Sequence, residues 1–201
     1  MRLSLAAKLL ATMAILGVAA GIAGLGTYAS FTSSTSAQAQ NLSSGTVSLT
    51  LGSTNRLTVS ASNLVPGDTI ERAVDLTNNG SAGTSSVGSI TVSTNATTSS
   101  LLDTDATNGL QMQIDNCSTA WTESGPPYTY TCSGTQTVAL ASAPVIGANA
   151  ALSNMSSVTA GNTDHLRVKL TLPTTAGNSF QGLSSVIDYT FTAEQRAAGS
   201  Q

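Results

Sequence analysis

A stretch near the C-terminal end of the chain decides the fold, and it reads Leu166-Arg167-Val168-Lys169-Leu170-Thr171-Leu172. Every second residue is apolar and every residue between is polar, which is the period of a β-strand with one buried face. An amphipathic helix would need apolar residues three or four positions apart. We therefore expect a half-buried strand over residues 166–172.

Six further segments repeat this alternation, and in 47–51 and 57–61 the residues between the apolar positions are Ser or Thr. The six segments are residues 47–51, 57–61, 70–76, 90–92, 110–114 and 187–191. Seven strands without an amphipathic helix between them predict an all-β fold, an antiparallel β-sandwich. Residues 94–109 and 141–163 are rich in small and polar residues, and we expect loops or short elements there.

Two short motifs predict turns between these strands. Pro66-Gly67-Asp68 suits a type II turn, because Pro fixes φ at the second position and Gly adopts the positive φ of the third. Asp68 and Glu71 flank this turn and are expected to be solvated. Asn78-Asn79-Gly80 is typical of another turn, with residues 82–86 as a flexible continuation.

The composition excludes several classes of protein. Ser and Thr together occupy 59 of the 201 positions, while only 8% of the residues are charged. A coiled coil would need abundant Glu, Lys, Leu and Arg, and a disordered chain would carry a larger net charge than −3. The pI near 4.8 and the lack of a basic stripe argue against a nucleic-acid partner.

The N-terminal residues have the pattern of a secretory signal peptide. Arg2 and Lys8 form a positive region, and an apolar run over residues 9–25 ends in small residues. A retained membrane anchor is the alternative, but the run is at the short end of what spans a bilayer. Cleavage is expected after Ala29 or after Ala39. Without Arg2 and Lys8, the secreted chain has ten acidic and five basic residues, a net charge of −5. We expect no membrane association after cleavage.

Cys117 and Cys132 are the only cysteines of the sequence, and they lack the C-x-x-C spacing of zinc and redox sites. In an exported protein they are expected to form a disulfide. The bridge would enclose Trp121, Tyr128 and Tyr130 in a surface excursion. We interpret these aromatic residues as packing over the edge of the sandwich, with a recognition patch as the alternative.

Five sequence motifs follow one another along the chain. They are Gly26-Thr27-Tyr28-Ala29-Ser30-Phe31-Thr32, Ser44-Gly45-Thr46-Val47 with Leu49, Asn63-Leu64-Val65-Pro66-Gly67-Asp68, Leu76-Thr77-Asn78-Asn79-Gly80-Ser81 and Asp188-Tyr189-Thr190-Phe191-Thr192-Ala193-Glu194-Gln195. In that order they resemble the TasA/camelysin family of secreted bacterial proteins, whose better-known members form biofilm matrix fibres. The motifs cover the N-terminal part of the chain and the last predicted strand.

The resemblance implies a jelly-roll type of β-sandwich, export through Sec, and assembly outside the cell. It also implies cleavage by a SipW-type signal peptidase after Ala29, so that Ser30 becomes the first residue. We therefore divide the chain into a signal peptide (1–29), an N-terminal extended segment (30–43) and a single β-sandwich domain (44–201). The expected partners are copies of the same chain, an accessory or anchoring subunit, and the signal peptidase during export.

The family resemblance also carries a metallopeptidase label, through camelysin. A helical zinc-peptidase site needs two His residues one turn apart and a neighbouring Glu, whereas this sequence has one His. His165 follows Asp164 in an alternating segment, so we expect it to face solvent at the start of a strand. We predict no catalytic residue, no metal ligand and no cofactor.

Residues 103–109 resemble a calcium loop, because Asp103 and Asp105 are closely spaced and a Gly follows. The register of an EF-hand fails, since Asn108 and Ile114 stand where Gly and Glu are required. A polar turn is the preferred interpretation, and an irregular calcium site is the alternative.

The segment after Ala29 is the candidate for subunit assembly. Residues 30–40 contain no charge, Pro or Gly, and they alternate weakly through Phe31, Ser33, Thr35, Ala37 and Ala39. Their side chains, with Phe31 as the only large one, bury too little surface to fold firmly onto their own domain, given an ordering cost of about 1–2 kcal/mol per residue. A neighbouring copy can supply the missing contacts, as in fibre-forming members of the family. A disordered tail is the alternative.

These observations predict a secreted, non-catalytic structural subunit of an extracellular or cell-surface fibre, assembled by head-to-tail strand donation. A monomeric surface adhesin or accessory protein of the same fold is one alternative. A camelysin-like secreted metallopeptidase is another.

Overall fold

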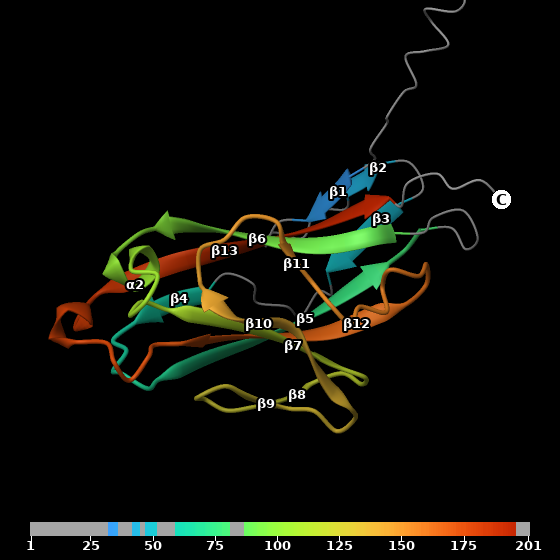
Figure 1. Ribbon diagram of the computed structural model, residues 1–201. Coiled ribbons are helices and arrows are strands. Elements are labelled where there is room, and N and C mark those ends of the chain that lie inside the picture. Colours follow the sequence, from blue (N-terminus) through green and yellow to red (C-terminus); the bar gives the residue numbers. More distant parts are fainter. Residues whose placement is uncertain (1–31, 36–41, 45–46, 52–58, 81–86, 196–201) are drawn as a thin grey trace, which may run out of the picture. The chain divides into compact units, whose positions relative to one another are not determined.

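The computed structural model of the chain describes residues 32–35, 42–44, 47–51, 59–80 and 87–195 (Figure 1). Helix within these ranges is limited to α2 (Leu101–Thr104) and the 3₁₀ turn η1 (Asn178–Phe180). In this part of the chain no helix is long and apolar enough to cross a membrane. The rest of the regular structure is β-strand.

One sheet, called the β13 sheet below, is built around the last described strand of the chain, β13. Its strands are β1 (Thr32–Thr35), β4 (Val59–Ser62), β6 (Val87–Thr98), β11 (Ala150–Ala151) and β13 (Ser184–Gln195). They follow the order β1-β13-β6-β11, and β4 also pairs with β13. All these pairs are antiparallel.

The second sheet, called the β12 sheet, contains the stretch that decides the fold. Its strands are β2 (Leu42–Ser44), β3 (Val47–Leu51), β5 (Thr69–Asn78), β7 (Gln111–Cys117), β10 (Gln136–Pro144) and β12 (Thr163–Thr171). They pair antiparallel in the order β10-β7-β12-β5-β3-β2. A separate hairpin is formed by β8 (Thr122–Ser124) and β9 (Thr129–Thr131).

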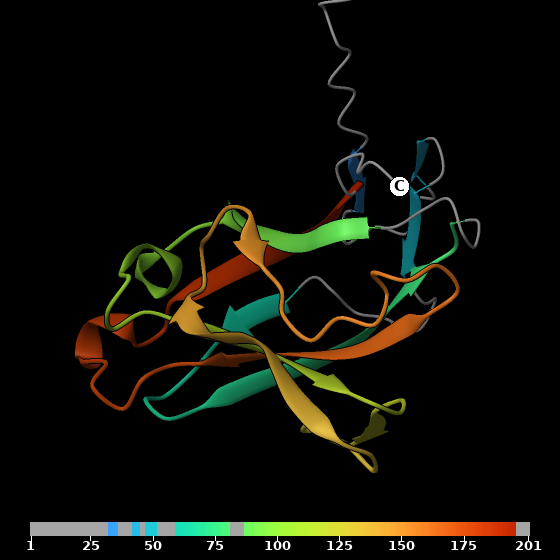
Figure 2. The same cartoon turned by 45° about the vertical axis from the view of Figure 1, so that its right-hand side comes forward.

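The two sheets pack face to face, so the predicted antiparallel β-sandwich is confirmed (Figure 2). The alternation of β12 continues through the whole strand, with Leu166, Val168 and Leu170 buried and the residues between partly covered. Tyr189 and Phe191 of β13 are fully buried opposite them in one core. Each large apolar side chain buried in this way stabilises the fold by about 1.5–3 kcal/mol. The jelly-roll connectivity stays a prediction.

All seven predicted segments contain strands. The two segments expected to be loops or short elements contain further strand residues. β6 runs to Thr98, and β10 and β11 lie partly or wholly in the segment 141–163. The alternation of β10 is interrupted by two register shifts, between Val138 and Leu140 and between Leu140 and Ala143. Because each irregularity changes which residues face the core, a period of two cannot be detected there.

The first predicted turn has the expected geometry. Gly67 has a φ of +99°, and the N–H of Asp68 donates to the carbonyl of Val65 at 3.0 Å, as in a type II turn. After β5, the side-chain oxygen of Asn78 accepts from the N–H of Gly80 at 2.9 Å. Residues 82–86, expected to continue this turn, lie outside the described residues.

One side of the sandwich is closed by the segment that contains β11. The N–H of Leu152 donates to Ile90 in the β13 sheet, while the N–H of Ser153 donates to Ala139 in the β12 sheet, both at 2.9 Å. The Asn154 amide donates to the carbonyl of Val138 at 3.0 Å. This segment therefore joins the edges of both sheets. The N-terminal strands β1 and β2 lie at the opposite edges.

Candidate functional site

The N-terminal segment forms a strand in the structure. Ser33 pairs with Ala193 and Thr35 with Phe191, so that β1 runs antiparallel along one edge of β13. β6 occupies the other edge of β13, and β4 pairs further along the same edge as β1. The predicted cleavage residues Ala29 and Ser30 and the predicted interface residues Phe31, Ala37 and Ala39 lie outside the described residues.

This pairing corrects one step of the sequence analysis. The small side chains of this segment led us to expect that it does not fold onto its own domain. Thr32–Thr35 nevertheless pair with β13 of the same chain. Small side chains bury little surface, but an open strand edge also offers unpaired backbone groups that favour strand addition.

Cys117 and Cys132 form the predicted disulfide, with their Cα atoms 5.8 Å apart. Cys117 is the buried last residue of β7, and Cys132 follows β9 directly. The bridge therefore closes the loop that contains the β8–β9 hairpin, and closing a loop of this length stabilises the fold by about 3 kcal/mol in the chain-entropy model. The hairpin lies outside the β12 sheet in both views (Figures 1 and 2).

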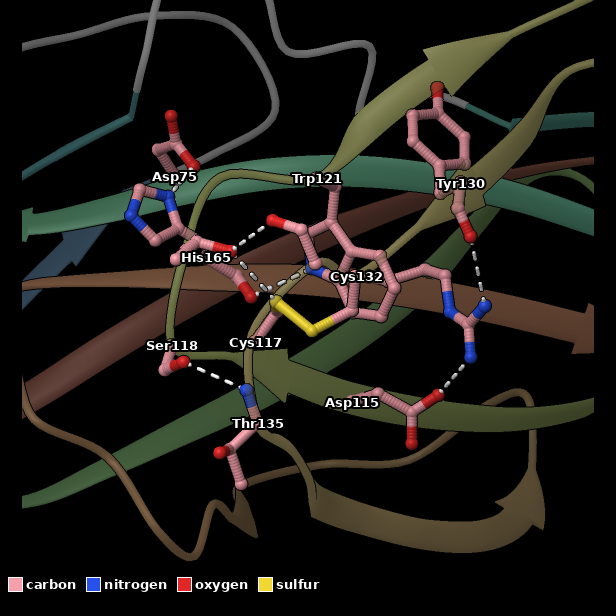
Figure 3. Close-up of a disulfide and its surroundings, with 12 residues drawn as sticks. Asp75, Asp115, Cys117, Ser118, Trp121, Tyr130, Cys132, Thr135 and His165 are labelled. Carbon is pink, nitrogen blue, oxygen red and sulfur yellow. Dashed lines mark hydrogen bonds and ion pairs between the residues drawn. A yellow bond between two sulfur atoms is a disulfide. The ribbon is translucent and has the colours of Figure 1, made fainter.

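Arg167 is the centre of the contacts beneath this hairpin. Its guanidinium lies 4.6 Å from the centre of the Trp121 ring, and the indole N–H donates to the carbonyl of His165 at 2.8 Å (Figure 3). Arg167 also pairs with Asp115 at 2.7 Å and with Glu71 at 3.3 Å. Trp121 thus packs on the outer face of the β12 sheet.

The ion pairs of Arg167 correct the expectation that Glu71 is solvated. Its side chain is only 15% exposed, and that of Asp115 is fully buried. Glu71 and Arg167 belong to adjacent strands, β5 and β12, and the distance between them is a tertiary property that the local sequence does not encode. Asp68 is half-buried, and its side chain accepts from the N–H of Val65 at 2.9 Å.

Tyr130 joins the hairpin to the β12 sheet. Its phenol donates to Glu123 at 2.5 Å and accepts a backbone hydrogen bond from Ala73, while its own N–H donates to the Glu71 carboxylate at 3.3 Å. Burial, together with the adjacent Glu123 carboxylate, raises the pKa of Tyr130 to about 12. The phenol therefore remains a neutral hydrogen-bond donor at physiological pH.

His165 lies near the start of β12, as predicted, but its side chain is mostly covered. It is 23% exposed, and its Nδ1 lies 2.6 Å from a carboxylate oxygen of Asp75 on the neighbouring strand β5. The nearby hydroxyl of Ser118 accepts from the N–H of Thr135 at 2.9 Å and closes the turn before β10. The His165–Asp75 pair is thus a cross-strand contact on the outer face of the sheet.

Asp103 and Asp105 act within a local turn. Asp103 accepts from the N–H of Ser100 at 2.7 Å and completes the capping box of α2. Burial raises its pKa, but hydrogen bonds from Ser185 and Ser99 outweigh that effect and lower it overall. Asp105 accepts from the N–H groups of Thr107 and Asn108, which lowers its pKa. These contacts match the preferred interpretation, a polar turn.

The structure also contains a buried carboxylate that the sequence analysis did not single out. Asp164, the inward-facing residue before His165, accepts from Asn116, from the N–H and hydroxyl of Ser156, and from the N–H of Ser157, all at 2.7–2.8 Å. Burial raises the pKa of Asp164, but the hydrogen bonds from Ser157 and Ser156 outweigh it, so the pKa is lowered. The apolar alternation extended back from Leu166 would have marked position 164 as buried.

The side chains that could hold the zinc ion of a peptidase are few. Every His, Cys, Asp and Glu of the sequence lies within the described ranges, and no three of these side chains there are grouped to hold a metal ion. Both Cys residues are bonded to each other, and His165 with Asp75 offers two donors. A catalytic zinc takes three protein ligands, so the residues present do not fit such a centre.

The fold and these contacts define an antiparallel β-sandwich with a disulfide-held hairpin on one outer face. Within that class, the family model described as camelysin metallo-endopeptidase matches residues 4–200. The chain belongs to this family, which confirms the resemblance drawn from the sequence motifs. Comparison with curated proteins found no match, and neither did comparison with solved structures.

Proposed function

We propose that the protein is a secreted, non-catalytic structural subunit of an extracellular or cell-surface fibre. In this fibre, the N-terminal segment of each copy pairs with β13 of the next. The observation that carries the proposal is the pairing of Thr32–Thr35 with the edge of β13. It supports the view that this segment is competent to form a strand and that β13 accepts one.

Exchange of this strand between copies conserves its backbone hydrogen bonds. The same register, Thr32 opposite Glu194 to Thr35 opposite Phe191, can form within one chain or between two. The strand itself therefore contributes little to the free-energy difference between monomer and fibre, as in domain swapping. Phe31 and the contacts between neighbouring subunits must therefore supply most of the free energy that favours the fibre over the monomer.

The arrangement of the edges favours growth in one direction. The edges of β10 and β11 are joined by residues 152–154, whereas β13 lies on the side of the N-terminal strands. The donated segment and the β13 edge that accepts it are different parts of the chain, so the two sides of the contact are not equivalent. Such a heterologous contact can be repeated from copy to copy. It gives an open filament when the rotation between copies does not close a ring.

The test is deletion of residues 30–39 from the secreted protein. We expect filaments in electron micrographs of the full mature chain and none of the deletion variant, while the β-sheet circular dichroism and thermal transition stay nearly unchanged. A variant in which the ten residues become a Gly/Ser linker is the matched control for length, and it should also fail to assemble. Filaments that persist in either variant would contradict strand donation.

The start of the mature chain is part of the same proposal. N-terminal sequencing of the secreted protein should give Ser30, in agreement with cleavage after Ala29. A chain starting at Gln40 would lack the donor segment and would leave the monomeric adhesin or accessory protein as the better interpretation. Mass spectrometry of the purified fibre would identify an accessory or anchoring subunit.

The family description favours a second candidate, a secreted metallo-endopeptidase. Hydrolysis of casein by the purified protein, its inhibition by a chelator and its loss in His165→Ala would establish it. We expect no hydrolysis above that of a mock purification, because the donor set around His165 does not fit a catalytic zinc.

A further inference from the structure

β5 has a strand on each side along only part of its length. β12 pairs with it from Thr69 to Thr77, whereas β3 pairs with Leu76–Asn78. Among the described strands, none pairs with residues 69–74 on the β3 side. An edge of this kind is a template for another extended chain.

The phase of the β5–β12 ladder directs backbone groups toward that edge. The N–H of Leu172 donates to the carbonyl of Asp68 at 3.0 Å, and the register then alternates between hydrogen-bonded and non-hydrogen-bonded pairs. Glu71 and Ala73 fall on the non-hydrogen-bonded positions. Their backbone N–H and C=O groups therefore point away from β12, where an added strand would need them.

Two side chains occupy these backbone groups, Arg72 of β5 itself and Tyr130 of the hairpin. The Arg72 guanidinium donates to the Glu71 carbonyl at 2.6 Å, and it lies 5.7 Å from the centre of the Tyr128 ring. The phenol of Tyr130 accepts the backbone hydrogen bond from Ala73. The N–H of Tyr130 donates to the side chain of Glu71 at 3.3 Å. The side chains of Tyr128 and Tyr130 thus lie along the edge of β5 where a partner strand would pair.

We infer that residues 122–131, the hairpin guard, close the β5 edge to the N-terminal segment of a second copy, so that this segment pairs at β13 only. The inference rests on the proposed function, because that function brings donor segments next to every exposed edge. The donor segment 30–39 fits the β5 edge for the same reasons that it fits β13: it has no charge, Pro or Gly. Neither Glu71 nor Arg72 would repel it.

The guard is fixed by contacts that do not involve the edge itself. The disulfide ties Cys132 to the end of β7, and Trp121 lies on Arg167. Thr122 and Thr131 are directly opposite each other in the hairpin. Residues 122–131 can therefore be replaced by Asn-Gly with both anchors kept. This replacement uncovers β5 and removes the buried Tyr130, but it removes no residue of the core cluster between the sheets.

The experiment uses a synthetic peptide of residues 30–39 in which a photoreactive benzoylphenylalanine replaces Phe31. The acceptors are the secreted protein lacking residues 30–39, with the guard intact or replaced by Asn-Gly. After irradiation, mass spectrometry locates the crosslinks. We expect crosslinks near residues 187–195 of β13 in both acceptors, and near residues 69–75 of β5 only when the guard is replaced.

A matched control shortens the hairpin without removing Tyr130. Ser124 lies opposite Thr129, so residues 125–128 can be replaced by Asn-Gly, and this variant should give little crosslinking at β5. Tyr130→Phe is a milder second variant that keeps the ring. It should speed hydrogen exchange of the Ala73 amide, even if the larger replacement fails to fold.

The outcomes separate this inference from the proposed function. Two results would overturn the inference that the hairpin guard closes the β5 edge. One is crosslinking at β5 with the guard intact, and the other is no crosslinking at β5 in a folded variant that lacks the guard. Unchanged exchange of the Ala73 amide in Tyr130→Phe would also count against it. Crosslinks that are missing from β13 in both acceptors would overturn strand donation, while a new β5 crosslink in the same experiment would still support the guard.

Discussion

At the scale of single residues, buried carboxylates tie loops to strands. Asp164 points into the core from β12, yet its oxygens accept hydrogen bonds from Ser156, Ser157 and Asn116. An ionised carboxylate in this position is stable only because those donors replace water. The Asp164 side chain therefore helps to hold the loop after β11 to the sheet.

We expect Asp164→Asn to lower the free energy of unfolding by about 3 kcal/mol at neutral pH, because an amide N–H would face donors that now require an acceptor. The measurement is urea denaturation followed by circular dichroism. Asp105→Asn is the matched control. It lies in an exposed turn where Asn can also accept from the backbone, and it should resemble the unsubstituted protein.

The lowered pKa of Asp164 also predicts how this difference depends on pH. A carboxyl group whose folded pKa lies below its unfolded value of 3.8 contributes stability that is fully present above that value. The contribution is lost as the pH falls through the folded pKa. The gap between the unsubstituted protein and Asp164→Asn should therefore narrow between neutral pH and about pH 3. A gap that widens on acidification would contradict the assignment.

At the scale of elements, the β8–β9 hairpin depends on the disulfide more than the sandwich does. We expect the double variant Cys117→Ser and Cys132→Ser to lose about 2–4 kcal/mol of stability. Hydrogen exchange should accelerate in residues 122–131 and stay slow in β12, because the core beneath does not involve the bridge. Unchanged exchange in the hairpin would show that Trp121 and Tyr130 hold it without the covalent link.

The strand β1 is defined by its backbone rather than by its side chains. Successive residues of a strand direct their N–H groups to opposite sides, so Ser33→Pro with Ser34→Pro removes one donor on each side. We expect this variant to form no filaments in electron micrographs, with a nearly unchanged thermal transition of the monomer. Alanine at both positions keeps the donors and should assemble normally. Filaments in the proline variant would argue against pairing at β13.

At the scale of the whole molecule, stability should not depend on a bound metal ion. The carboxylates of Asp103, Asp105 and Asp164 accept hydrogen bonds from the protein itself. We therefore expect a chelator to leave the thermal transition unchanged in scanning calorimetry. A transition that falls with the chelator and recovers when calcium is added back would revive the irregular calcium site.

Some elements of the sandwich could be predicted from local sequence patterns, and others could not. The alternation in residues 166–172 is a property of consecutive residues, so the strand β12 and its buried face could be predicted. The turn at Gly67 could be predicted from three consecutive residues, and the disulfide from the presence of only two cysteines in the sequence. β10 was not predicted, because two register shifts remove the period that would have identified it.

The sequence by itself therefore determined the fold class, the family, the disulfide and the faces of the main strands, because periodicity, motif order and residue counts are written along the chain. Only the tertiary structure decided which residues meet. The register of β12 against β5 and β7 places Arg167 between Glu71 and Asp115, and it places His165 opposite Asp75. A shift of one position would reverse every face, so these partners follow from packing and not from any local pattern.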